Sequence, residues 1–197
     1  MEALRRPGGL LVLPTETLYG FSARASDQAS LQRLQSLKGR GNQGFVAIAS
    51  DLAMVQRYLP ENTSSGLIGW LSEAWPAALS VILAVNQPAN WGRVSVDCGA
   101  TAAFRVPTHA WLRELARKLG EPILSTSVNR TGAPPHLTCA AIAREFGAQV
   151  DCLIEDPGLE VAGIERRAST LVDATQWPPI LLRQGAFPLE IPGAGDS

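Results

Sequence analysis

Hydroxyl and carboxylate side chains follow the first apolar run of this chain directly. Residues 10–13 form a short, continuous apolar run after a glycine pair, which is typical of a buried strand. Pro14 ends the run because proline cannot donate to a sheet ladder, and Thr15, Glu16 and Thr17 come next. Open α/β sheets bind ligands at such strand ends, so a binding site is one interpretation. Taken alone, the segment fits a threonine turn or a helix N-cap better.

Three more short segments place cations, hydroxyls or amides at the end of a predicted element. Lys38 and Arg40 close a predicted helix, where cations that complement the helix dipole are the more common explanation. The segment lacks the residue order of a phosphate-binding P-loop. Ser127 and Asn129 follow a predicted strand and fit a turn with Asx bonding. Arg183, near the end of the last predicted strand, completes the set.

Arg105 is the most informative candidate because it lies inside an apolar strand. Residues 102–106 are otherwise hydrophobic, and a buried charge without a partner is costly. An internal ion pair with a carboxylate such as Asp97 and a bidentate clamp on a substrate carboxylate or phosphate explain it equally well. The cations and hydroxyls together, with no histidine or cysteine placed as a nucleophile, indicate anion binding by positioning and electrostatics.

The choice between lysine and arginine in this sequence supports a specific role for Lys38. Lys38 and Lys118 are the only lysines among 17 basic residues, so a lysine kept at position 38 suggests a need for its compact ammonium group. His109 and His136 have no histidine partner one helical turn away, and no metal site is predicted. The three cysteines lack C-x-x-C spacing, which favours reduced thiols over a disulfide framework or a zinc site.

The hydrophobic pattern predicts the scaffold that must position these residues. Strands are expected at residues 10–13, 45–49, 79–85, 94–97, 102–106, 123–127, 150–154, 169–173 and 180–183. Helices are expected at residues 27–37, 51–58, 61–75, 109–119 and 138–146. Because strands and helices alternate irregularly, we expect one α/β domain over residues 1–197, with a twisted mixed sheet and flanking helices.

Composition limits the classes of function. The net charge of -1 gives no overall field that would attract nucleic acid, so any polyanion must be held by a local cluster. No apolar run approaches the roughly 20 residues that span a bilayer. The first residues lack the apolar core of a secretory signal. We therefore expect a cytoplasmic protein without a membrane partner.

The ordered set of motifs resembles a known family over nearly the whole chain. The motifs are PTETLYG at residues 14–20, LKGR at 37–40, WP at 75–76, FRVP at 104–107, STSVNRTG at 125–132, STLVD at 169–173 and LRQG at 182–185. One such motif would be weak evidence, whereas the ordered set is strong. The chain is similar to the YrdC/TsaC family of threonylcarbamoyl-AMP synthases, and to its short bacterial form without an extra C-terminal domain.

This resemblance implies a YrdC-like fold with a concave cleft lined by basic residues. It implies a nucleotidyltransferase that condenses L-threonine, bicarbonate and ATP, with Mg²⁺, into threonylcarbamoyl-AMP and pyrophosphate. The product would serve threonylcarbamoyladenosine modification of tRNA through a transferase complex, so that contact with RNA is indirect or weak. Carried over position by position, the family pattern assigns catalysis to Lys38 and Arg40; ATP binding to these two with Thr101, Ser127, Asn129 and Arg183; and threonine binding to Thr17, Arg105, Ser125 and Ser169.

Several positions depart from the usual family pattern. They include Gly41 and Ala77, where a proline and a glycine are common, and Val128, where a smaller alanine is common. These changes keep an alternative open, a divergent YrdC-like paralogue that binds nucleotide or RNA without making the adenylate. A carbamoyl-adenylate module of the hydrogenase-maturation kind ranks below both, because it normally belongs to a much larger chain.

Overall fold

The computed structural model of the chain describes residues 1–39, 45–86, 91, 93–95, 99–160 and 166–189. Three residues named in the sequence analysis, Arg40, Gly41 and Asp97, lie outside these ranges, as does the end of the strand predicted at residues 94–97. The helices are α1 (Glu2–Arg5), α2 (Gln28–Lys38), α3 (Leu52–Gln56), α4 (Ser65–Ala74), α5 (Ala110–Leu119) and α6 (Cys139–Phe146), with 3-10 turns η1 (Gly147–Gln149) and η2 (Pro157–Leu159). The strands are β1 (Leu11–Leu13), β2 (Gly20–Arg24), β3 (Val46–Ile48), β4 (Leu79–Ala84), β5 (Arg93–Ser95), β6 (Gly99–Arg105), β7 (Ile123–Ser127), β8 (Cys152–Leu153), β9 (Thr170–Asp173) and β10 (Ile180–Arg183).

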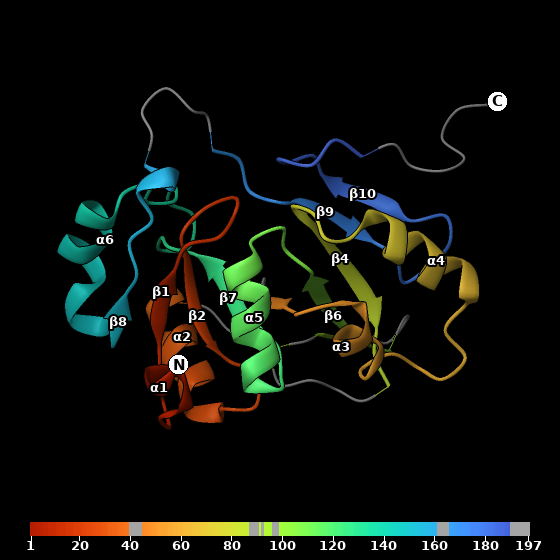
Figure 1. The fold of residues 1–197 in the computed structure, drawn as a ribbon, viewed down its shortest axis with the longest axis horizontal. Helices are drawn as coiled ribbons and strands as arrows, with labels where there is room; N and C mark the ends of the chain where they lie inside the picture. Colours follow the sequence, from red (N-terminus) through yellow and green to blue (C-terminus); the bar gives the residue numbers. More distant parts are fainter. Residues whose placement is uncertain (40–44, 87–90, 92, 96–98, 161–165, 190–197) are drawn as a thin grey trace.

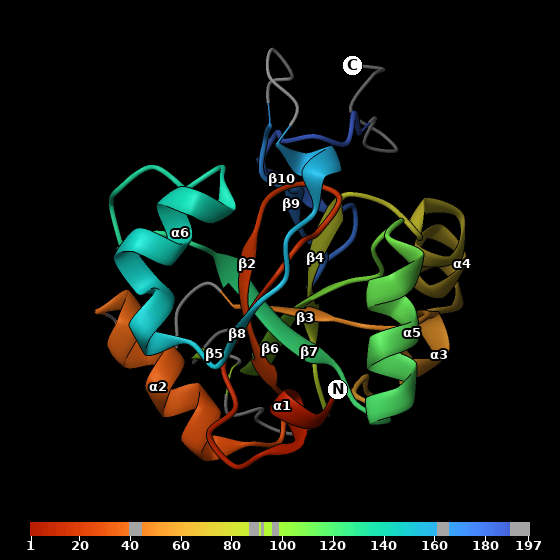
Figure 2. The ribbon, with the colours of Figure 1, turned by 60° about the vertical axis from the view of Figure 1, so that its left-hand side comes forward.

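The strands form one mixed sheet, which confirms the predicted fold class. Their order is β10-β9-β4-β6-β3-β7-β2-β1-β8, with β5 paired to β6. Parallel pairs join β1 to β8, β3 to β6 and β4 to β9, and the other pairs are antiparallel. Strands β9 and β10 lie at the opposite end of the sheet from β1 and β8 (Figure 1). Figure 2 shows helices α2 and α6 on one side of the strands and α3, α4 and α5 on the other.

Aromatic contacts anchor the strands that lead to the site. Phe21 of β2 packs edge-on against Phe146 of α6, with ring centroids 5.0 Å apart. Phe104 of β6 lies 5.6 Å from the ring of Tyr58, which follows α3. Phe21 and Phe104 are fully buried. These contacts tie β2 to α6, and β6 to the segment that follows α3.

Helix α2 is capped at both ends by hydrogen bonds or by backbone conformation. The Asp27 carboxylate caps it by accepting from the backbone of Ala29, and it also accepts from the Ser30 hydroxyl and the Gly8 amide. The C-cap residue Gly39 adopts the left-handed conformation (φ 64°) that glycine tolerates best. Lys38 is the last helical residue, as predicted.

The element predictions miss one strand, one short α-helix and the two 3-10 turns, and they misplace the ends of other elements. Strand β2 was not expected, because Gly20, Ser22 and Arg24 make its five residues look like an extension of the polar loop. Helix α1 is one turn long and was also missed. Strand β6 begins at Gly99, three residues before the expected start, because its first residues pair with β5. Among the described residues, no helix is long and apolar enough to cross a membrane.

Candidate active site

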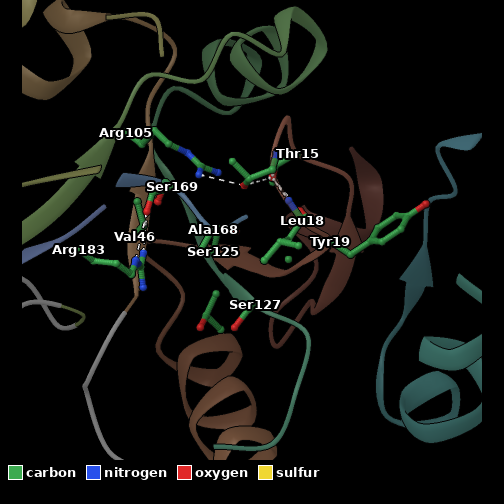
Figure 3. A pocket seen from close by; sticks show the side chains of 13 residues that line it. Thr15, Leu18, Tyr19, Val46, Arg105, Ser125, Ser127, Ala168, Ser169 and Arg183 are labelled. Carbon is green, nitrogen blue, oxygen red and sulfur yellow. Dashed lines mark hydrogen bonds between the residues drawn. The ribbon is translucent and has the colours of Figure 1, made fainter. Parts of the chain in front are cut away.

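A cavity of about 280 Å³ opens at the ends of several strands. Its walls come from the β1–β2 connection, β3, the end of β6, β7, the residues before β9, and the end of β10 (Figure 3). Six of the residues predicted from sequence line it, namely Thr17, Arg105, Ser125, Ser127, Ser169 and Arg183. The other lining residues are Thr15, Leu18, Tyr19, Gly20, Val46, Thr126 and Ala168.

The β1–β2 connection is a threonine turn, and the turn is part of the cavity wall. The Thr15 hydroxyl donates to the Leu18 carbonyl (2.7 Å) and accepts from the backbone amides of Thr17 and Leu18 at 3.1 and 3.2 Å. The local interpretation of this segment is therefore confirmed for Thr15. The same turn places the Thr17 hydroxyl 3.3 Å from an Arg105 Nη atom, which donates to it. The segment therefore forms the turn and also lines the cavity, and its role in binding stays a prediction.

Arg105 has a buried carboxylate partner, but it is Glu16. The Arg105 side chain is 6% exposed, and its Nε lies 3.6 Å from Glu16 Oε1. Neither Nε nor the two carboxylate oxygens has a hydrogen-bond partner among the described residues. Burial lowers the pKa of Arg105, the charge of Glu16 opposes that shift, and the charge of Arg183 adds to it. Arg105 therefore forms an internal ion pair and also lines the cavity, and its role as a clamp on a substrate anion stays a prediction.

Arg183 is held by backbone rather than by a carboxylate. Its Nε and Nη2 donate to the Ser169 carbonyl at 3.2 and 2.9 Å. The Ser169 hydroxyl lies 2.8 Å from that of Ser80, which is fully buried in β4. Burial also lowers the pKa of Arg183. Figure 3 shows Arg105, Ser169 and Arg183 along one side of the cavity, opposite Thr15 and Leu18.

Ser80 supports the site, although the sequence analysis did not select it. A serine between apolar residues in a buried strand is the signal that could have found it, because a buried hydroxyl needs a partner. Gly20 also has a steric role. A Cβ atom at this position would lie 2.4 Å from the Ser125 hydroxyl, so any residue other than glycine would displace that hydroxyl.

Tyr19 lines the cavity while its ring points away from the other labelled side chains (Figure 3). Its hydroxyl donates to Glu160 and accepts from the backbone amide of Asp156. Burial is the main reason that its pKa is raised, and the hydroxyl stays protonated at neutral pH. Tyr19 therefore ties the β1–β2 connection to η2.

Lys38, Thr101 and Asn129 are not among the residues that line the cavity. The Lys38 ammonium is buried and donates to the Ser127 carbonyl, which belongs to the cavity wall. Thr101 is buried in β6, in register with Ala84 of β4. Their assignment to ATP stays a prediction, as does that of Arg40. In the described part of the chain, no three His, Cys, Asp or Glu side chains lie close enough together to hold a metal ion.

The family model and the similar proteins identify the same family for this chain. A model of the Sua5/YciO/YrdC domain, described as telomere recombination, matches residues 3–185. A threonylcarbamoyl-AMP synthase of Pyrococcus abyssi is 33% identical over 189 residues, which cover 94% of this chain and 53% of that protein. A threonylcarbamoyl-AMP synthase of Nitrosococcus oceani is 35% identical over 156 residues, covering 78% of this chain and 81% of that protein.

A solved structure resembles the fold closely. The crystal structure of P. abyssi Sua5 complexed with L-threonine superposes with a TM-score of 0.78 at 27% identity. The match covers 95% of this chain and 54% of that one. The chain therefore spans about half the length of the P. abyssi protein.

Proposed function

Because the chain belongs to the Sua5/YciO/YrdC family, we propose that it is a threonylcarbamoyl-AMP synthase, which condenses L-threonine, bicarbonate and ATP and releases pyrophosphate. The observation that carries the proposal is that two guanidinium groups, Arg105 and Arg183, line one hydroxyl-rich cavity. The reaction joins two anions, and such a cavity can neutralise both without a protein nucleophile.

The Arg105 end of the cavity suits the amino acid. A guanidinium group can bind a carboxylate through two parallel hydrogen bonds. The Arg105 guanidinium is held in place by Glu16, which lies beside its Nε, and by Thr17, which accepts from one of its Nη atoms. The hydroxyls of Ser125 and Ser169 supply neutral hydrogen-bonding groups nearby. A site that hydrogen-bonds the threonine hydroxyl can reject valine strongly, because its polar groups would be left unpaired.

The Arg183 end suits the nucleotide. The threonine amine and bicarbonate form a carbamate with loss of water. A carbamate oxygen then attacks the α-phosphorus of ATP in line, an oxygen–phosphorus bond forms, and pyrophosphate leaves with the bonding electrons. Arg183 and Ser127, which line the same cavity, would stabilise the phosphate charge together with Arg40 of the LKGR motif. ATP would enter as its magnesium complex, with Mg²⁺ held mainly by the phosphates, as is usual for this ion. The threonylcarbamoyl group would then pass to tRNA through a transferase complex.

The test is pyrophosphate release from ATP and bicarbonate with each amino acid in turn. We expect release that depends on threonine, with valine slower by about 10⁴-fold if the threonine hydroxyl is read by hydrogen bonds. Binding of ATP and threonine without release would support the divergent paralogue instead. No binding of either substrate would overturn the proposal.

A further inference from the structure

The Lys38 ammonium group has a complete set of acceptors within the protein. Nζ donates to the carbonyl of Ser127 at 2.9 Å, to the carbonyl of Asn129 at 2.8 Å and to the side-chain Oδ1 of Asn129 at 2.8 Å. Three acceptors match the three N–H groups of an ammonium ion. Lys38 is 3% exposed, and these bonds help to offset the cost of burying its charge.

The acceptors belong to one turn, and the side chain of Asn129 organises that turn. Asn129 Oδ1 also accepts from the Ser127 hydroxyl at 2.6 Å. Its Nδ2 donates to the carbonyls of Arg130 and Ala133 at 2.9 and 2.6 Å. All four hydrogen-bonding positions of the amide are therefore used, which also fixes its orientation. We call residues 127–133 the β7 turn.

Lys38 is attached to the β7 turn from two directions. Its side chain contacts the start of the turn, and its backbone carbonyl accepts from the Thr131 hydroxyl at 2.7 Å. The C-terminal end of α2 and the β7 turn are therefore joined as one unit. Ser127 is the member of this unit that lines the cavity.

We infer that Lys38 is a positioning residue, which acts on the cavity by holding Ser127 and Asn129 in place, and that it does not itself bind the phosphates. The inference rests on the proposed function, because it concerns the nucleotide end of the same site. An ammonium that served ATP directly would have to give up bonds that hold the β7 turn. An arginine could not replace it, because a planar guanidinium cannot direct three donors at acceptors clustered on one side.

A double-mutant cycle in the full chain tests this inference. Lys38→Met keeps the aliphatic stem and removes the donors, and Ser127→Ala removes the group that is positioned. We expect Lys38→Met to lower kcat/KM for ATP by about 100-fold, the size of effect that a misplaced group produces. In the Ser127→Ala background the same change should cost about tenfold less, because positioning an absent hydroxyl has no value. If Lys38 binds phosphate directly, the two losses multiply, and the inference is wrong.

Two further measurements separate the inference from folding defects and from the proposed function. Hydrogen exchange reports the turn without any activity: the amides of Asn129 and His136, which donate to the Ser127 and Val128 carbonyls, should exchange at least about tenfold faster in Lys38→Met. Unchanged exchange would overturn the inference even if the wild type is active. An inactive wild type with faster exchange in the variant would contradict the proposed function alone. Lys118→Met, at the other and exposed lysine, is the matched control and should change neither quantity.

Discussion

The two arginines of the cavity have similar chemistry and very different surroundings. Arg105 lies at the end of a central strand, 5% exposed, with the buried carboxylate of Glu16 at its Nε and the Thr17 hydroxyl at its Nη. Arg183 lies on the edge strand β10, whose four residues are exposed, and among the described residues its guanidinium donates to the Ser169 carbonyl alone. The Arg105 guanidinium is therefore contacted on several sides, whereas one side of the Arg183 guanidinium is open to solvent.

This difference indicates a division of labour. A rigid, compensated guanidinium suits a small carboxylate, whose position must be defined to within a fraction of an ångström before it reacts. An arginine at an open edge suits a long polyanion, because the triphosphate can extend past it into solvent. The carbonyl that holds Arg183 belongs to Ser169, which lies between the two arginines in the cavity wall, so the two ends are mechanically linked there.

The largest effect should come from Arg105→Lys. Lysine keeps a charge beside Glu16 but cannot form two parallel hydrogen bonds, so the KM for threonine should rise by about 100-fold. The KM for ATP should stay within about threefold, as measured by pyrophosphate release. The matched control is Arg24→Lys, at an ion pair with Glu121 of nearly the same length (3.7 Å) outside the cavity. An equal rise in the KM values for threonine and ATP would contradict the proposal that Arg105 binds threonine and Arg183 binds ATP.

A smaller and opposite pattern is expected for Arg183→Ala. Its loss removes charge at the open end, and the KM for ATP should rise by about tenfold. Threonine affinity, measured by isothermal titration calorimetry without ATP, should change less than about threefold. Loss of threonine binding in this variant would mean that the two arginines serve the same ligand.

Ser80→Ala tests the link between the ends. Removing the hydroxyl leaves that of Ser169 without its neighbour 2.8 Å away, a loss of about 1 kcal/mol. We expect the KM values for threonine and ATP to rise together by about three- to fivefold in steady-state assays. The control is Ser72→Ala, an exposed serine of α4. An effect on one substrate only would show that Ser169 serves a single end.

The smallest effect on the cavity is expected for a substitution of Asp27, whose contribution to the stability of the fold depends on pH. Burial alone raises the pKa of Asp27, but the bonds from Ser30, Gly8 and Ala29 outweigh it, so the pKa lies below its usual value. A carboxylate with a lowered folded-state pKa stabilises the fold above its unfolded pKa of about 3.9, and that stability is lost as the pH falls through the folded pKa.

Asp27→Ala should therefore cost about 1 kcal/mol of unfolding free energy at pH 7, and less at pH 3, as measured by urea denaturation. Because Asp27 lies outside the cavity, both KM values at pH 7 should stay unchanged. A cost that grows toward low pH would contradict the sign of this argument.

The sequence analysis recovered the ends of the cavity better than their supports. Arg105, Ser127 and Arg183, which line the cavity, were identifiable because a polar residue inside or at the end of an apolar strand leaves a local pattern. The partner of Arg105 was not, because Glu16 and Arg105 are 89 positions apart and nothing local relates them. The Lys38–Asn129 bonds were missed for the same reason. Strand β2 was missed because Gly20, Ser22 and Arg24 make its sequence look like an extension of the polar loop, although four of its five residues are buried.

The most direct test of the account is a crystal structure of the protein with L-threonine and a non-hydrolysable ATP analogue. We predict the threonine carboxylate on Arg105 and the triphosphate passing Arg183, with Lys38 still bonded to Ser127 and Asn129. A triphosphate bound to Arg105, or a Lys38 ammonium that has left the β7 turn for a phosphate oxygen, would contradict it.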